Sequence, residues 1–137
     1  MSYLHGYEPE EQKRLENQAN YLQEAIHEAV DFSNRKSLLE IGCGTGAQGR
    51  VIIEKYTALK YTGIDISKIQ INKASKIFET IELKKRTLFK QITQNTFPLE
   101  NNQFDSAFIC WVLEHAKNPT QVIKETHRVL QKMLFYM

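Results

Sequence analysis

Three glycines and two acidic residues stand at a spacing that could bind a cofactor. Gly42, Gly44 and Gly46 follow a short apolar run and precede a predicted helix. Glycine allows left-handed backbone angles and close approach of a ligand, and a helix start offers amide groups without partners inside the helix. Glu40 comes just before the glycines, and Asp65 comes about 20 residues after them, where a carboxylate can accept hydrogen bonds from ribose hydroxyls. The pattern predicts a loop that binds an adenosine-containing cofactor.

The glycine spacing alone leaves the class of cofactor open. Gly42-x-Gly44-x-x-Ala47 satisfies the permissive dinucleotide fingerprint, and enzymes that use NAD also carry an acidic residue after their second strand. Glu40 is more informative, because an unpaired carboxylate inside a buried strand is costly. We therefore expect Glu40 to serve the site rather than to be an exposed charge at a strand end. An NAD-dependent oxidoreductase stays an alternative.

Strands and helices are expected to alternate around this loop. Apolar runs predict strands at 37–41, 60–65, 87–92 and 104–111, and helical periodicity predicts helices at 8–31, at about 46–56, from 67 and from 118. Ser67 and Gln70 form a capping box, and Asn118 with Pro119 opens the last helix. The expected inward-facing residues of the last two helices are Ile71, Ala74, Ile77, Phe78, Ile81, Val122, Ile123, Thr126, Val129 and Leu130.

This alternation predicts an α/β fold, a Rossmann-like open parallel sheet with helices on both faces. Ligands of such sheets bind beyond the carboxyl ends of the strands, which places Gly42, Asp65, Thr93 and Cys110 at the site. Residues 133–137 look like the beginning of a fifth strand, so we expect the sheet to be incomplete at its C-terminal side.

Length and composition fit one domain over residues 1–137, with an N-terminal helix and lid at 1–33 and an α/β core at 37–137. The net charge of +2 is too weak to indicate a nucleic-acid partner. No stretch approaches the roughly 18 apolar residues of a membrane span. Cys43 and Cys110 lack the spacing of metal ligands, so we expect no metal and a reducing, cytoplasmic setting.

Several segments resemble motifs of class I S-adenosylmethionine-dependent methyltransferases of the small-molecule type. Residues 38–46 resemble their first motif and residues 61–67 their second. Residues 97–105 and 110–115 resemble the segments around the fourth strand, and residues 127–130 resemble the end of the helix before the fifth. The resemblance implies methyl transfer from S-adenosylmethionine to a small-molecule acceptor, with S-adenosylhomocysteine as the product.

The resemblance also implies roles for single residues. Glu40 would hold the ammonium group of the cofactor, directly or through the loop and a water, and Asp65 would bind the ribose. Ile66 would lie on the adenine face, with Gln70 nearby. The residues implied to lie against the methionine part, two of them through backbone groups, are Gly42, Cys43, Gly44, Gly46, Cys110 and Trp111.

The chain departs from the family pattern after the third strand. The family usually has an acidic residue there that binds the adenine amino group, and here the position is Thr93, followed by Gln94 and Asn95. A side-chain amide can accept that hydrogen bond as a neutral partner. We therefore expect weaker or rearranged adenine contacts.

The acceptor side has fewer candidates. Methyl transfer from a sulfonium mainly needs alignment and exclusion of water, and a general base only where the acceptor holds its proton near neutral pH. His115 is the candidate base, and a structural histidine is the alternative. The resemblance implies that a segment such as Tyr3–Tyr7 folds over the cofactor as a lid, and simple packing on the surface is the alternative. Arg14 and Gln18 share a helix face and could reach a carboxylate.

The C-terminal end leaves two further expectations. Residues 127–132 lack the Gly-Gly turn that the family usually has there, so a cofactor-binding fragment or pseudo-enzyme without turnover stays the main alternative to an enzyme. A bare parallel edge of the sheet is open to pairing, which makes a homodimer through that edge an expected form of assembly.

Overall fold

The computed structural model describes residues 8–110 and 112–132. Its sheet has four parallel strands in the order β3-β2-β1-β4. The strands are β1 (Ser37–Ile41), β2 (Lys60–Asp65), β3 (Thr87–Gln91) and β4 (Ser106–Ile109). The predicted open parallel α/β sheet is confirmed, and its first two strands have the predicted bounds.

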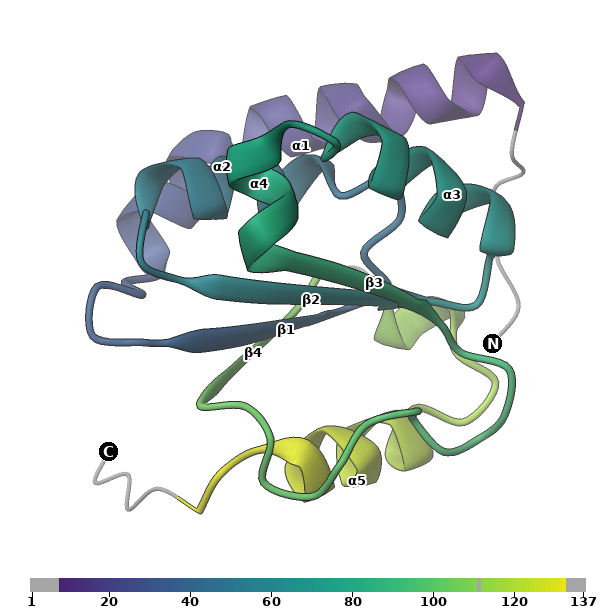
Figure 1. Cartoon of the computed structure of the whole chain (residues 1–137). Coiled ribbons are helices and arrows are strands. Elements are labelled where there is room, and N and C mark those ends of the chain that lie inside the picture. The colour runs from purple at the N-terminus through teal and green to yellow at the C-terminus, as the bar shows by residue number, and fades with distance from the viewer. Residues whose placement is uncertain (1–7, 111, 133–137) are drawn as a thin grey trace.

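Helices cover both faces of this sheet, as Figure 1 shows. One face carries α1 (Pro9–Ala29), α2 (Ala47–Lys55), α3 (Lys68–Ile77) and α4 (Ile81–Arg86). The opposite face carries α5 (Pro119–Val129), which follows a short 3-10 turn, η1 (Leu113–His115). None of the described helices has the length and apolar character needed to cross a bilayer.

The strand order places the site at β1. The chain runs outward from β1 through β2 to β3, and then returns to the other side of β1 to form β4. The carboxyl end of β1 is therefore the switch point, where ligands of open parallel sheets bind. Glu40 lies in this part of β1, opposite Gly63 of β2 and Phe108 of β4.

Alternate side chains of β1 enter two different cores. Leu38 belongs to an upper cluster under α2, whereas Leu39 and Ile41 belong to a lower cluster that includes residues of α5. The period of two in a strand makes this division. Glu40 has the parity of Leu38, so its carboxyl lies on the face of the glycine loop's helix, α2.

Two apolar residues expected to face inward are exposed. Ile77 is 39% exposed and Ile123 is 54% exposed. The sequence predicted one helix running from Ser67 past Ile81, but the structure has two. The first, α3, ends at Ile77, and α4 begins at Ile81 after a short turn in which Phe78 is buried. Ile123 is one position off the stripe of Val122, Thr126 and Val129, all of which are buried.

The fourth strand is shorter than the predicted 104–111. Asp105 turns away from the ladder, because its carboxylate accepts hydrogen bonds from the amides of Lys36 and Ser37 at 2.7 and 3.1 Å. Phe104 forms an isolated parallel bridge to Leu130 instead. The chain after α5 thus comes alongside the start of β4. The expected fifth strand at 133–137 lies outside the described residues.

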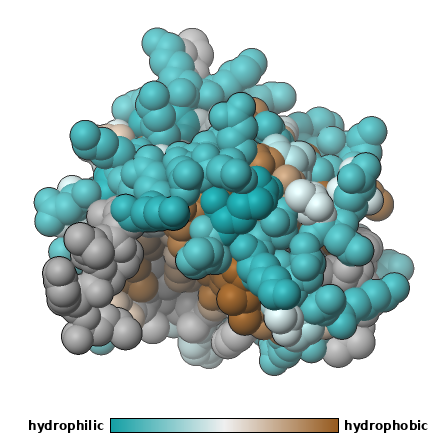
Figure 2. Space-filling view, turned by 90° about the horizontal axis from the view of Figure 1, so that it is seen from below, coloured by the Kyte–Doolittle hydropathy of each residue, from teal (hydrophilic) through white to brown (hydrophobic). Residues whose placement is uncertain are grey.

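The face of the molecule below the sheet is only partly covered by polar groups. Figure 2 looks at this face from below, and apolar side chains reach its surface between polar ones. The lower cluster is bordered by half-buried apolar side chains, among them Ala107, Ile109, Leu113 and Leu130.

One of the three cations in the last turn of α4 has a structural role. Lys84 and Lys85 are exposed. Arg86 instead donates hydrogen bonds to the carbonyls of Ile53, Tyr56 and Leu59, at 2.9 to 3.3 Å. It therefore satisfies backbone acceptors at the end of α2, which would otherwise lack partners.

Candidate cofactor-binding site

The glycine loop has the left-handed geometry that its sequence predicts. Gly42, Gly44 and Gly46 have φ angles of 70°, 56° and 80°. A Cβ on Gly42 would come within 2.2 Å of Val112, and one on Gly46 within 2.8 Å of Phe78. A Cβ on Gly44 would meet no atom within 4 Å. Gly44 is therefore the loop glycine at which a ligand can approach the backbone.

Cys43 points from the loop into the protein. It is 6% exposed, and its sulfur covers Gly63 of β2 so closely that a Cβ there would lie 2.8 Å from it. Its amide and that of Gly42 both donate to the Ile64 carbonyl, at 3.0 and 2.8 Å. The loop is thus tied to β2 on the side away from the open space at Gly44.

Asp65 fixes the loop from the end of β2. Its Oδ2 accepts a hydrogen bond from the Gly44 amide, and its Oδ1 accepts one from the Ser67 amide, each at 2.9 Å. Burial raises the pKa of Asp65, and these amide hydrogen bonds oppose the rise. Each carboxylate oxygen can accept a further hydrogen bond, which is what a pair of ribose hydroxyls would require.

The predicted capping box forms only in part. Ser67 Oγ accepts the hydrogen bond of the Gln70 amide at 3.2 Å. The Gln70 side chain does not return a hydrogen bond to Ser67, because the Ser67 amide already donates to Asp65. Gln70 is 2% exposed, and its Oε1 accepts no hydrogen bond from any described residue. The Gln70 side-chain oxygen is therefore a buried acceptor without a donor in the described part of the chain, close to the turn in which Asp65 accepts the Ser67 amide.

Glu40 is buried with a partner that the sequence did not reveal. It is 3% exposed, and Tyr61 Oη donates a hydrogen bond to its Oε1 at 2.5 Å. Burial raises the pKa of Glu40 to about 8, the hydrogen bond from Tyr61 opposes the rise, and the charge of Asp65 adds to it. The alternative of an exposed charge at the strand end is wrong.

A hollow of about 310 Å³ lies beside the ends of β2 and β3. It brings together four of the residues expected to meet adenine: Ile66, Thr93, Gln94 and Asn95. No carboxylate lines it among the described residues. Its remaining walls come from the loop after β3 and from residues at and just before the start of α5: Ile92, Phe97, Lys117, Asn118, Gln121 and Val122. No sequence signal pointed to Lys117 and Gln121, and the others were marked only as parts of strands, helices or motifs.

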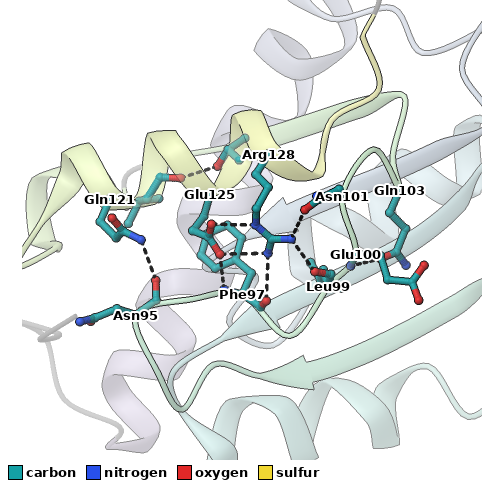
Figure 3. A network of polar contacts seen from close by, with 11 residues as sticks. Asn95, Phe97, Leu99, Glu100, Asn101, Gln103, Gln121, Glu125 and Arg128 are labelled. Atoms are coloured by element: carbon teal, nitrogen blue, oxygen red, sulfur yellow. Dashed lines mark hydrogen bonds and ion pairs between the residues drawn. The ribbon is translucent and has the colours of Figure 1, made fainter.

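Side chains of α5 hold the loop that forms this hollow, as Figure 3 shows. Gln121 Nε2 donates to the Asn95 carbonyl at 3.4 Å, and Glu125 Oε1 accepts the Phe97 amide at 2.7 Å. Arg128 pairs with Glu125, at 2.8 Å, and donates to the carbonyls of Phe97 and Leu99. The loop after β3 is therefore fixed from both ends of α5.

The far side of the glycine loop carries the remaining candidates. Cys110 follows β4, is half-buried, and accepts a hydrogen bond from Gln48 Nε2 at 3.7 Å. Burial raises its pKa, which fits a structural thiol rather than a nucleophile. His115 ends η1, and its Nε2 lies 3.4 Å from Glu114 Oε1.

Some predicted residues are engaged elsewhere or cannot be placed. The guanidinium of Arg14 pairs with Glu11 of the same helix. Trp111 and the expected lid at 3–7 lie outside the described residues. No group of three or more His, Cys, Asp or Glu that could hold a metal ion occurs in the part of the chain that the structure describes.

These features suit a cofactor with a cationic end, a ribose and a flat base. Gly44 gives open space, Asp65 gives acceptors for a diol, and Glu40 lies beneath the loop as an acid. An ammonium group near the buried Glu40 would favour the charged carboxylate, whereas the pyrophosphate of a dinucleotide would oppose it. The site therefore fits S-adenosylmethionine better than NAD.

Comparisons with known proteins agree with this geometry. Residues 39–132 match the family model described as a methyltransferase domain. A sterol 24-C-methyltransferase of Gibberella zeae is 31% identical over 94 residues, which cover 69% of this chain and 24% of the relative. The 27-O-demethylrifamycin SV methyltransferase of Amycolatopsis mediterranei is 26% identical over 127 residues, which cover 93% and 46%. The chain spans less than half the length of these relatives.

Solved structures share the fold. A SAM-dependent methyltransferase from Aquifex aeolicus aligns with a TM-score of 0.76 and 20% identity, covering 92% of this chain and 69% of the other. The [4+2]-cyclase SpnF aligns with a TM-score of 0.72 and 28% identity, covering 82% and 41%. The family model covers well over half of the 137 residues and includes the whole glycine loop and Asp65. The chain belongs to the class I S-adenosylmethionine-dependent methyltransferase family.

Proposed function

We propose that the protein binds S-adenosylmethionine at this site and transfers its methyl group to a small-molecule acceptor. The observation that carries the proposal is the pair of carboxyls, Glu40 and Asp65, on the two sides of a glycine loop that is open at Gly44. A cofactor whose methionine end carries an ammonium group and a sulfonium suits this acidic surrounding.

Each part of the site has a task in holding the cofactor. Glu40 accepts from the ammonium group, directly or through the loop and a water, and Asp65 accepts from the ribose hydroxyls. Ile66 covers the adenine base, and an amide oxygen of Gln94 or Asn95 accepts from its amino group. The remaining groups placed against the cofactor are Gly42, Cys43, Gly44, Gly46, Gln70, Thr93, Cys110 and Trp111.

The bound cofactor supplies an activated methyl group, and the protein must orient the acceptor and exclude water. His115 is the base that would take a proton from the acceptor, since it lies just past the carboxyl end of β4. Its Nε2 lies 3.4 Å from Glu114 Oε1.

Small-molecule acceptors are supported by the names of similar proteins, which include sterol methyltransferases, a demethylrifamycin methyltransferase and a probable tetrahydroprotoberberine N-methyltransferase of Papaver bracteatum. C-, O- and N-methyltransferases all occur among these similar proteins. The weak net charge of +2 gives no support to a nucleic-acid acceptor.

Calorimetry tests cofactor binding. S-adenosylmethionine and S-adenosylhomocysteine should bind to the chain, and NAD should not. Tighter binding of NAD than of either sulfur compound would overturn the proposal. Turnover is tested by incubating the chain with S-adenosylmethionine and pools of small metabolites, and by measuring S-adenosylhomocysteine.

Cofactor binding without methyl transfer is the second candidate. The likeness to SpnF favours it, because that protein shares this fold and is described as a [4+2]-cyclase. Tight binding of S-adenosylmethionine with no S-adenosylhomocysteine formed from any pool would support this candidate over the first.

The proposed setting is the cytoplasm, where Cys43 and Cys110 would stay reduced; both are free. A homodimer through an exposed sheet edge is the proposed assembly. Sedimentation velocity tests it, and a monomer at all concentrations would exclude it.

A further inference from the structure

Tyr61 places a polar group inside the buried upper cluster. The residue is 2% exposed. Its ring stacks on Phe78 with centroids 6.2 Å apart and meets Phe89 edge-on at 5.8 Å. Such packing restricts the ring, so the position of the hydroxyl is fixed by apolar contacts. That hydroxyl donates to Glu40 Oε1.

Gly49 of α2 leaves the space that this ring needs. A Cβ on Gly49 would lie 2.4 Å from Tyr61 Cζ and 2.5 Å from its Oη. The first turn of α2 thus passes directly over the hydroxyl end of the ring. Three elements meet here: α2 after the glycine loop, β2 with Tyr61, and β1 with Glu40.

The titratable groups that interact with Glu40 lie on β2, in the glycine loop and after β4, and α2 contributes none of them. Tyr61 and Asp65 lie on β2, Cys43 in the glycine loop, and Cys110 after β4. None of these groups is a cation. Burial and the charge of Asp65 both disfavour the carboxylate, and the pKa of Glu40 rises to about 8. At neutral pH the carboxyl therefore keeps its proton, and the hydrogen bond from Tyr61 is what favours its loss.

We propose that Tyr61 is a positioning residue for the cofactor: its hydroxyl holds the Glu40 carboxyl beneath the glycine loop, and the ammonium end of the cofactor binds as this carboxyl releases its proton to solvent. The inference rests on the proposed binding of S-adenosylmethionine. Tyr61 touches neither cofactor nor acceptor in this scheme. It acts through Glu40 by stabilising the charged form that the ammonium group needs.

The scheme predicts a linked proton. Binding of a ligand with an ammonium group releases up to one proton while Glu40 is protonated in the free protein. The affinity then rises with pH, by up to about tenfold per pH unit, until the pH passes the pKa of free Glu40. A ligand with the same adenosine part but no ammonium group releases no proton from Glu40.

The experiment is calorimetry of the full chain at several pH values between about 6 and 10, in buffers with different ionisation enthalpies. Variants and wild type are compared at each pH, which cancels the titration of the ligand's own amino group. The probes are S-adenosylhomocysteine and 5′-methylthioadenosine, which lacks the amino-acid end. Both present a ribose to Asp65, so their comparison cancels any titration of Asp65. We expect proton release and a rising affinity with the first probe, and neither with the second.

Three variants locate the effect. Glu40→Gln keeps an acceptor for the Tyr61 hydroxyl and has no proton to lose, so it should bind S-adenosylhomocysteine weakly and without pH dependence. Tyr61→Phe should lose several-fold in affinity at neutral pH and should approach the wild type as the pH rises. Tyr56→Phe is the matched control. Tyr56 also packs on the upper cluster and donates to a carbonyl, Val30, at 3.2 Å, and its removal should not alter the pH profile.

Two results would overturn the inference. One is equal proton release with both probes; the other is a loss of affinity in Tyr61→Phe that is the same at every pH, as a purely structural role would give. If neither probe binds to the folded wild type, the proposed function falls and this inference with it. Circular dichroism of each variant confirms that a loss of binding is not a loss of fold.

Discussion

The Asp65 carboxylate accepts a hydrogen bond from the Gly44 amide at 2.9 Å, and so joins the end of β2 to the most open point of the glycine loop. Its other oxygen holds the amide of Ser67, the residue that caps α3. One side chain therefore shapes the loop and faces the place proposed for the ribose.

Replacing Asp65 should weaken cofactor binding. Asp65→Ala removes charged acceptors, each of which contributes roughly 1.5–3 kcal/mol, so the affinity for S-adenosylhomocysteine should fall by at least tenfold. Asp31→Ala is the matched control, because Asp31 also accepts an amide two residues later, from Ser33 at 2.9 Å, but lies before β1, whereas the loop follows β1. Calorimetry measures both. An unchanged affinity of Asp65→Ala would remove this residue from the site.

Glu40→Gln should change how stability depends on pH. The pKa of Glu40 in the folded protein is about 8, above the ordinary glutamate value, so the folded state holds a proton that the unfolded state has lost. Stability from this group is complete below the ordinary pKa and declines as the pH rises towards about 8, by up to about 1.4 kcal/mol per pH unit. Urea unfolding across this range should show a smaller decline for Glu40→Gln. Parallel curves for the two proteins would contradict the burial of an ionisable acid.

Two glycine substitutions should have opposite consequences. Gly49→Ala places a Cβ 2.4 Å from the Tyr61 ring, and such overpacking costs about 1–3 kcal/mol of stability. The new Cβ of Gly44→Ala has no neighbour within 4 Å, so the variant loses only about 1–2 kcal/mol, which is what a left-handed backbone costs a residue with a side chain. Its methyl group, however, enters the space proposed for the cofactor. Thermal unfolding measures the loss of stability of each variant, and calorimetry measures its loss of affinity for the cofactor. Gly44→Ala should lose more affinity than Gly49→Ala for the same loss of stability. The reverse order would place the ligand elsewhere.

Arg128→Ala should loosen the loop that forms the hollow. The substitution leaves Glu125, which is 6% exposed, without its cation, and removes the donor of two loop carbonyls. We expect a loss of about 2–3 kcal/mol, towards the low end for a broken buried pair because the Arg128 side chain is 28% exposed. Arg50→Ala breaks an exposed pair with Glu54 and should cost less than about 0.5 kcal/mol. Urea unfolding compares the two variants.

The same pair gives a dependence on acid pH. The hydrogen bond from Arg128 lowers the pKa of Glu125, so its contribution to stability is present above the ordinary glutamate pKa and is lost as the pH falls through the lowered value. Arg128→Ala should therefore flatten the acid limb of the unfolding curve. An unaltered acid limb would mean that the pair contributes nothing to folding.

Sequence patterns predicted those parts of the molecule that depend on neighbours in the chain. The strands at 37–41 and 60–65, the cap at Asn118 and the left-handed glycines follow from local spacing, and the structure confirms them. The family resemblance correctly indicated the fold. The helical spacing of apolar residues wrongly predicted that Ile77 faces inward. The helix ends at this residue, and a helix end depends on the turn that follows it rather than on the apolar spacing within the helix.

Contacts between distant segments were not predictable in the same way. Tyr61 and Glu40 are 21 residues apart, and their hydrogen bond depends on the register between β1 and β2 and on the absence of a side chain at Gly49. Lys117 and Gln121 line the hollow because α5 begins beside the end of β3, which no local motif records. The roles of the predicted site residues remain predictions that the experiments above test.

The inward position of Cys43 matters for a protein that binds an alkylating agent. A sulfonium methyl group reacts with thiolates, and the glycine loop carries a cysteine within it. Burial raises the pKa of Cys43 well above its ordinary value, and its sulfur lies over Gly63, away from the open side of the loop. The thiol is thus kept protonated and turned from the place proposed for the donor, so this inward position would protect the loop from methylating itself.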